Sequence, residues 1–346
     1  MSYYRNDDND KKENNDIRDL NIPHHRVTSS KNKNRIVTIN NYNQTNDNDE
    51  HNIDINDIVS EEENDNIFMK QIKHMFQKFR FASFTFIIVV FLIIIFIASL
   101  VIYKYNLRKI SKIIEFSDDQ KKSLSWSCSL YFIGSNYTPA IILNKQIHRL
   151  LSAIFLHGSY SHLGGNILSM LFTSFFVEDF IGLMRFMIFF FLSGIYGNLL
   201  AGIFEKDTQS LGASGVIFGI YGILIQISIF HWKSFSEKTK NLFFYFILIF
   251  VINFISSFSN YKETHTAIFA HIGGFLIGLM IGYCYIDLDE NHNFFTDNTL
   301  NKLKIAQKVC FIMTILTYVA TIIIYITLDI DQHSNKLGNS CNKLIN

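Results

Sequence analysis

The sequence predicts an all-α polytopic membrane protein. Two observations carry this prediction: seven segments are each apolar over about 20 residues, the length that crosses a bilayer core, and 49% of the 346 residues are hydrophobic. A soluble helical protein can hold one or two such segments, but seven imply a membrane protein. The predicted spans are 83–103, 162–180, 184–204, 213–232, 242–260, 266–286 and 309–328.

The spans differ in character. The first, fifth and seventh contain nearly continuous apolar runs, Phe84–Tyr103, Leu242–Phe258 and Val309–Leu328. The second and fourth are less hydrophobic because they carry His, Asn, Ser and Gly. We therefore predict a six-span core over residues 76–290, with a long first loop at 104–156. Residues 291–346 then supply a loop, the seventh span and a short tail.

The N-terminal residues 1–75 have a different composition. Residues 1–70 contain 16 Asn, and their 15 acidic residues against 9 basic ones give a formal charge of −6. Such a segment buries too little apolar surface to offset the entropy of ordering, so we predict a disordered tail. It contains no apolar run of signal-peptide length. The first span is therefore expected to act as an internal signal anchor.

Loop charges predict the orientation. The fourth-to-fifth loop carries Lys233, Lys238 and Lys240, whereas the third-to-fourth loop carries one lysine between two acids. Cytosolic loops are enriched in basic residues, so the N-terminus is expected in the cytosol. Loop one and the C-terminus then face outward, where Asn136-Tyr137-Thr138 is a glycosylation acceptor motif. The expected location is the secretory pathway or the plasma membrane.

The four cysteines are too few and too scattered for a disulfide framework or a metal site. They are Cys128, Cys284, Cys310 and Cys341. Cys128 and Cys341 can pair if both lie on the outer side, although unpaired thiols are the simpler interpretation.

Unusual polar residues gather on the second, fourth and sixth spans. The second opens with His157, His162 and Asn166, the fourth with Ser214, and the sixth has His271 in its first third. These three spans run in the same direction, so the polar residues lie toward one face of the membrane at similar depth. Ionisable residues in a membrane are costly and commonly functional. The pattern predicts a site that water reaches from one side.

Ser214 and His271 have the chemistry of a nucleophile and its base. Ser214 stands at a helix N-terminus, where free backbone N–H groups can stabilise an oxyanion, and Gly212 and Gly215 let a substrate backbone approach. Taken alone, the serine motif is more typical of a small-residue helix seam than of an active site, and a lone histidine is often bonded to a backbone carbonyl. Phe218, four residues after Ser214, is expected to pack on the imidazole.

Glycine spacing predicts that the fourth and sixth spans come close together. Gly274, Gly278 and Gly282 share the helical face of His271, and the fourth span has a matching row of small residues. No Asp or Glu lies in the apolar part of any span, so we expect a Ser–His dyad without a third member.

His162 and Asn166 lie one turn apart and are expected to donate hydrogen bonds to an oxyanion beside the Ser214 amide. The alternative is a metal site at His157 and His162. Their spacing places them on different helical faces, and no His-Glu-x-x-His motif is present, so neither a metal nor another cofactor is predicted.

Together these motifs resemble the rhomboid intramembrane serine proteases. They are Leu156-His157, His162-Leu163-x-x-Asn166, Gly212-Ala213-Ser214-Gly215 and Ala270-His271-x-Gly273-Gly274. His148-Arg149 resembles the family's Trp-Arg motif, with His148 in place of Trp. The resemblance covers about residues 145–285 and implies a rhomboid-like six-helix core with one additional C-terminal helix, as in secretory-pathway members.

By this resemblance, Ser214 is the nucleophile, His271 the base, and His162 and Asn166 the oxyanion donors. Arg149 would be a structural residue of the first loop. The implied function is an intramembrane serine endopeptidase that cuts single-span membrane proteins near the outer end of their helix. Its expected partners are those substrates and the lipid bilayer, with no nucleic acid and no metal.

Two alternatives belong to other classes. An inactive rhomboid-like protein that binds membrane clients needs neither Ser214 nor His271. A seven-span transporter or receptor should show charged pairs or broken helices at mid-membrane, and the sequence shows neither.

Overall fold

The computed structural model describes residues 83–113, 117–259, 267–288 and 295–345. The predicted tail over residues 1–75 lies outside them. The described residues are helical, with one isolated antiparallel bridge between Asn136 and Ser210. The long helices are α3 (Phe84–Ile113), α7 (Tyr160–Ile181), α8 (Leu183–Phe204), α9 (Ser214–His231), α10 (Glu237–Ser259), α12 (Ile268–Tyr285) and α13 (Asp297–Ile326).

Each of the seven predicted spans is a helix. Six of these helices are long and apolar enough to cross a membrane, namely α3, α8, α9, α10, α12 and α13. The remaining one, α7, has 22 residues, but its His, Asn, Ser and Gly residues lower its hydropathy. It contacts α3, α8, α9 and α10, so it is an integral part of the bundle.

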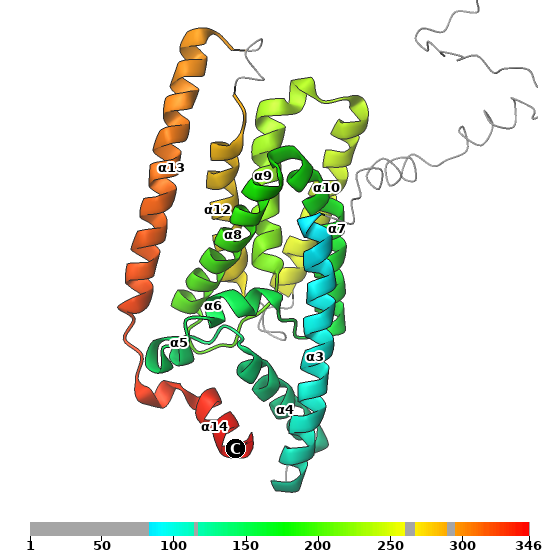
Figure 1. Ribbon diagram of the computed structural model, residues 1–346, viewed down its shortest axis with the longest axis vertical. Coiled ribbons are helices and arrows are strands. Elements are labelled where there is room, and N and C mark those ends of the chain that lie inside the picture. Colours follow the sequence, from blue (N-terminus) through cyan, green and yellow to red (C-terminus); the bar gives the residue numbers. More distant parts are fainter. Residues whose placement is uncertain (1–82, 114–116, 260–266, 289–294, 346) are drawn as a thin grey trace, which may run out of the picture. The chain divides into compact units, whose positions relative to one another are not determined.

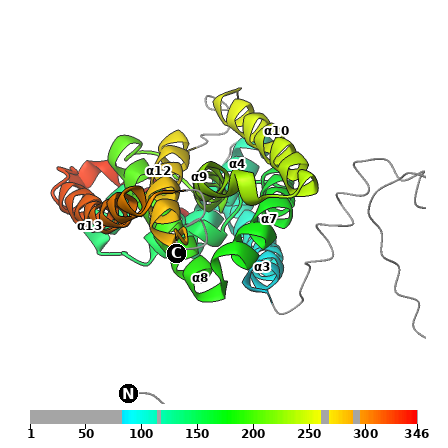
Figure 2. The same ribbon diagram turned by 90° about the horizontal axis from the view of Figure 1, so that it is seen from above.

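Helix α9 lies in the middle of the bundle, with α12, α8, α7 and α10 around it (Figure 2). Its membrane-crossing segment is 67% buried, compared with 17% for α10 and for α13. The central position explains why α9 is apolar on all sides. A residue at its first turn is therefore surrounded by protein.

The predicted first loop is itself largely helical. Helix α3 continues past the bilayer-length segment to Ile113, and α4 (Asp118–Ile133), α5 (Thr138–Asn144), α6 (Arg149–Ser152) and the 3₁₀ turn η1 (Ala153–Phe155) follow. Ser117 and Gln120 form a capping box at the start of α4. The short helices gather at one end of the bundle (Figure 1). They therefore form a layer over the helix ends at which Ser214 and His271 lie.

The interpretation of all four cysteines as unpaired is wrong. Cys128 of α4 and Cys341 of α14 (Lys336–Ile345) form a disulfide with Cα atoms 5.3 Å apart. The bond ties the C-terminal segment to the first loop at the same end of the bundle (Figure 1). The two cysteines are 213 positions apart in the sequence, so their spacing alone does not predict the pair. Cys284 and Cys310 are free.

The glycosylation motif at Asn136 is not available at the surface. Asn136 is only 2% exposed, and its side-chain amide donates to the Asn198 carbonyl and the Ser210 hydroxyl, each at 2.9 Å. An acceptor asparagine has to be exposed on a surface loop. Asn136 instead joins loop one to α8 and to the segment before α9.

Candidate functional site

Ser214 and His271 meet at the end of the bundle that loop one covers. Ser214 is the first residue of α9 and His271 is the fourth residue of α12. His271 Nε2 lies 2.7 Å from Ser214 Oγ, within hydrogen-bond distance. The imidazole is 5% exposed. A serine and a histidine separated by 57 residues are thus in direct contact.

The imidazole of His271 is oriented by an aromatic ring. The Phe218 ring stacks on it with centroids 4.3 Å apart and planes 5° from parallel. The second ring nitrogen, Nδ1, is buried and has no hydrogen-bond partner within the part of the chain that the structure describes. No carboxylate therefore holds the ring from behind at the described positions, so its placement depends on Phe218 and on the α12 backbone.

Glycines allow the close approach of α9 and α12. A Cβ atom on Gly274 would overlap the carbonyl oxygen of Gly215, and one on Gly278 would overlap that of Gly219. At Gly215 a Cβ would lie 3.2 Å from the Ala270 carbonyl oxygen. The expected small-residue seam is present, and it brings the two helices close enough for the serine–histidine contact.

His162 and Asn166 line the approach to Ser214 across Gly212. Gly212 has φ +124°, and a Cβ on it would lie 2.8 Å from His162 Cε1 and 3.6 Å from Asn166 Nδ2. Both the backbone conformation and the space therefore require glycine here. Because Ser214 is the first helical residue, its own N–H has no partner within α9. The His162 ring and the Asn166 amide thus lie beside Gly212, two residues before the Ser214 N–H.

His157 supports Asn166. Its Nε2 lies 2.8 Å from Asn166 Nδ2, and its ring stands edge-on to His162 at 5.1 Å. Burial, together with the neighbouring His162, lowers the pKa of His157 to about 3. His157 is consequently neutral at physiological pH and accepts from the Asn166 amide. His162, five residues after His157, lies beside Gly212. The residues that the structure describes contain no group of three potential metal ligands.

Arg149 lies within loop one rather than beside Ser214. Its Nη1 donates to the carbonyls of Tyr131 at 2.7 Å and Ser135 at 3.0 Å, and its Nε donates to Gln146. The guanidinium also stands 4.2 Å from the Tyr131 ring centre. His148, next to it, is exposed at the start of α6. Arg149 therefore joins the end of α4 to α6.

Three further side chains near the site have no motif that marks them in the sequence. Trp126 of α4 donates from its indole to the Gly158 carbonyl at 2.7 Å, and so fixes the turn before α7. Gln209 joins the segment before α9 to Ser135 in loop one. Glu205, at the end of α8, lies near the backbone amides of Ile268 and Phe269 in α12, which oppose the rise in its pKa that burial causes. Each is a lone polar residue whose partner is distant in the sequence.

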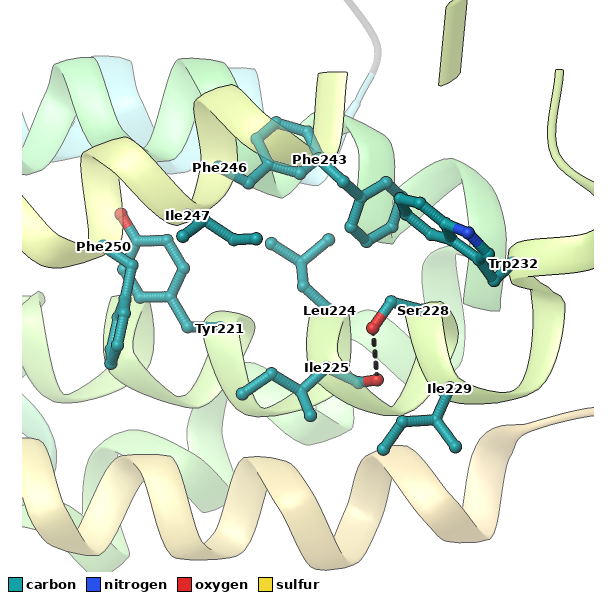
Figure 3. Close-up of a pocket in the computed structure, with 10 residues that line it drawn as sticks. All are labelled: Tyr221, Leu224, Ile225, Ser228, Ile229, Trp232, Phe243, Phe246, Ile247 and Phe250. Atoms are coloured by element: carbon teal, nitrogen blue, oxygen red, sulfur yellow. Dashed lines mark hydrogen bonds between the residues drawn. The ribbon is translucent and has the colours of Figure 1, made fainter. Parts of the chain in front are cut away.

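A separate apolar groove lies between α9 and α10. It has a volume of about 310 Å³, extends along α9 from Tyr221 to Ile229 and reaches Trp232 just after that helix (Figure 3). Ser228, its most polar member, donates its hydroxyl proton to the Ile225 carbonyl. The groove carries no reactive side chain, and Ser214 and His271 do not line it.

Comparison with known proteins shows which family this site resembles. The family model for the Rhomboid domain matches residues 144–288, which include α6 to α12 with Ser214, His271, His162 and Asn166. The chain is 35% identical to Rhomboid-like protease 3 of Toxoplasma gondii over 159 residues, which are 45% of this chain and 58% of that protein. It is 28% identical to RHOMBOID-like protein 2 of Arabidopsis thaliana over 223 residues, 63% of this chain and 69% of that protein.

Some of the relatives are named as proteases, and one is named as inactive. Inactive RHOMBOID-like protein 8 of Arabidopsis thaliana is 30% identical over 148 residues, 43% of this chain and 41% of that protein. For most of these relatives the chain spans less than two thirds of their length. The domain match and the multi-pass bundle of apolar helices agree with each other. Residues 144–288 of this integral membrane protein are therefore similar to the Rhomboid domain.

Proposed function

We propose that the protein is an intramembrane serine endopeptidase in which Ser214 is the nucleophile and His271 the general base. The observation that carries the proposal is the 2.7 Å contact between Ser214 Oγ and His271 Nε2. A seam of glycines makes that contact possible, and hydrophobic packing alone does not require it.

The reaction follows from this geometry. His271 Nε2 accepts the Ser214 proton as Oγ attacks the scissile carbonyl carbon, forming a tetrahedral intermediate. Return of that proton to the leaving amine breaks the C–N bond and leaves an acyl-enzyme. Water, deprotonated by His271, then attacks the ester and releases the acyl product and the serine.

The Ser214 amide, His162 and Asn166 are proposed as the oxyanion donors. The ring of His162 and the amide of Asn166 flank Gly212, which precedes the nucleophile Ser214 by two residues. The helix N-terminus adds a partial positive charge at the same place. Fixed donors of this kind stabilise the developing oxyanion in a site that excludes most water. His157 acts through Asn166 by holding its amide.

The substrates are proposed to be single-span membrane proteins. Ser214 lies near the outer end of α9, so a substrate helix is cut near its own outer end. A helix hides its carbonyl groups in internal hydrogen bonds, so the scissile segment has to unwind. Small or helix-weakening residues at that point should therefore favour cleavage.

The N-terminus is proposed to be cytosolic, with loop one and the C-terminus in an exoplasmic compartment such as the secretory pathway. The disulfide between Cys128 and Cys341 supports this orientation, because disulfides persist in oxidising compartments and are rare in the cytosol. The lysines between α9 and α10 then face the cytosol, as the distribution of positive charge favours. A six-span core over residues 76–290 followed by a seventh helix, the six-plus-one arrangement, remains part of the proposal.

The test is cleavage of a model single-span substrate by the full chain in liposomes. Ser214→Ala and His271→Ala should each reduce the rate by at least about 10³-fold, because the dyad acts as a unit. Ser228→Ala, on the same helix and outside the site, should cleave like the wild type. Wild-type rates in Ser214→Ala would contradict the proposal. Absence of cleavage in the wild type would favour a client-binding role.

A further inference from the structure

The chain between α8 and α9, which leads into Ser214, is attached to loop one by its backbone. The Ser210 amide donates to the Asn136 carbonyl and the Asn136 amide donates to the Ser210 carbonyl, each at 2.9 Å. Two residues later, the Gly212 amide donates to the Ala153 carbonyl, also at 2.9 Å. Both attachments therefore lie within four residues of Ser214.

The side chain of Asn136 adds a second contact at the same place. Its Nδ2 donates to the Ser210 hydroxyl and to the Asn198 carbonyl, each at 2.9 Å. Asn198 belongs to α8 and donates in turn to the Leu150 carbonyl of α6, at 2.9 Å. Asn136 and Ser210 are both buried, so water competes little for these hydrogen bonds. One side-chain amide thus joins loop one, α8 and the segment before Ser214.

This segment carries a part of the site that tolerates little displacement. Gly212, between Ser210 and Ser214, has φ +124° and lies against the His162 ring and the Asn166 amide. These two side chains and the Ser214 amide are the proposed oxyanion donors, so their mutual distances depend on where the segment lies. A misplacement of about 1 Å can cost about 10²-fold in rate.

We propose that Asn136 is a positioning residue for Ser214, because its side-chain amide fixes the segment before α9 against loop one and α8. The position of that segment sets the distances between the nucleophile and the oxyanion donors. The role rests on the proposed protease function. Asn136 does not touch the reacting atoms and acts through Ser210.

The two polar atoms of the Asn136 side chain differ in their contacts. Nδ2 makes both hydrogen bonds, whereas Oδ1 is buried without a partner among the residues that the structure describes. A buried acceptor without a partner costs free energy. Asn136→Ala removes this cost together with the two donated bonds, so part of the loss of stability is offset. The backbone bridge to Ser210 stays possible in that variant, because main-chain atoms form it.

The test compares Asn136→Ala with the wild type in liposomes, using a single-span substrate and a fluorophosphonate probe that labels an activated serine. We expect kcat to fall about 10- to 100-fold with KM unchanged, and the rate of Ser214 labelling to fall in parallel. The final labelled fraction should equal that of the wild type, and the midpoint of thermal unfolding should stay above the assay temperature. Loss of folded protein would lower these last two quantities instead.

A second variant keeps the test informative if Asn136→Ala does not fold. Ser210→Ala removes one acceptor of the Asn136 amide, and kcat should fall about 2- to 10-fold, the worth of one neutral hydrogen bond. Because both substitutions break the same contact, the double variant should be no slower than Asn136→Ala alone. Asn144→Ala, at an exposed asparagine of the same loop, should match the wild type throughout.

Three outcomes would overturn the proposal. They are wild-type kcat and labelling rate in Asn136→Ala, a fall in kcat matched by the final labelled fraction, and fully additive effects in the double variant. If the wild type itself does not cleave, the proposed function fails separately. Hydrogen exchange then decides the contact: faster exchange of the Ser210 and Gly212 amides in Asn136→Ala supports it, and unchanged exchange contradicts it.

Discussion

At the scale of single residues, the site depends on glycines as much as on reactive side chains, because α9 and α12 approach closely only where no Cβ atom separates them. Gly274 and Gly278 bring α12 against α9, and any Cβ at either position would overlap a backbone carbonyl of α9. Backbone is less able to move than a flexible side chain. The serine–histidine contact is therefore sensitive to substitutions that do not touch either residue.

Gly274→Ala should destabilise the protein by about 1–3 kcal/mol, the usual cost of overpacking, and should reduce cleavage more strongly than it reduces stability. Gly165→Ala on α7 is the matched control, because nothing lies within 4 Å of its Cβ position. Alanine there should be neutral or slightly stabilising. Thermal unfolding and cleavage rates of the two variants give the comparison. Equal effects of the two substitutions on unfolding and cleavage would contradict the role of the glycine seam.

The sequence predicts some of the contacts made by single residues and not others. Ser214, His271, Phe218 and the glycines follow from helical spacing, because residues on one face of a helix are fixed by its period. The contacts of Gln209 and Trp126 do not, because each joins segments whose relative placement only the folded chain determines.

At the scale of elements, the start of α3 depends on a buried carboxylate of α7. Glu178 accepts from the backbone amides of Phe84 and Thr85 at 2.8 and 2.9 Å, and from the Thr85 hydroxyl at 2.7 Å. Glu178 is 8% exposed. It thus caps one helix from another and joins them at the end of the bundle away from Ser214.

Glu178→Gln should lower the free energy of unfolding by about 1–3 kcal/mol, because charge-assisted hydrogen bonds to a buried carboxylate are lost or weakened. Thr85→Val removes one of the three bonds and should cost less. Denaturation of both variants in detergent provides the measurement. A larger loss of unfolding free energy in Thr85→Val than in Glu178→Gln would refute the capping role of the carboxylate.

Helix boundaries show which elements sequence can define. Three predicted spans have ends within two residues of the observed helix ends, because polar residues stand directly there. They are 184–204 for α8, 213–232 for α9 and 266–286 for α12. Helices α3 and α13 extend about ten residues beyond their apolar runs, since hydropathy detects only the part that matches a bilayer. Hydropathy does not detect the helices of loop one, because α4 is too polar and α5 and α6 have only 7 and 4 residues.

At the scale of the whole molecule, the Cys128–Cys341 disulfide closes the chain on itself. It joins loop one to the last helix across 213 residues, and Tyr137 adds a hydrogen bond to the Ser334 carbonyl at 2.8 Å. A bond that closes so long a loop restricts the unfolded chain strongly. The C-terminal segment is therefore part of the folded unit that covers the site.

Cys341→Ser should reduce stability by about 2–4 kcal/mol and leave the Cys128 thiol free to react with thiol reagents. Cys310→Ser removes a free thiol and should leave the unfolding midpoint close to that of the wild type. Alkylation followed by mass spectrometry reads the pairing directly. Alkylation of Cys128 in the unreduced wild type would show that the bond does not form.

The central claim is that Ser214 is a nucleophile activated by His271, and labelling with a fluorophosphonate probe tests it most directly. Attack of Ser214 Oγ on phosphorus displaces fluoride and leaves a stable ester, while His271 takes the proton. We predict that mass spectrometry finds the label on Ser214 of the wild type and not in His271→Ala. No label on Ser214 in a wild type that cleaves substrate, or undiminished labelling in His271→Ala, would contradict the account.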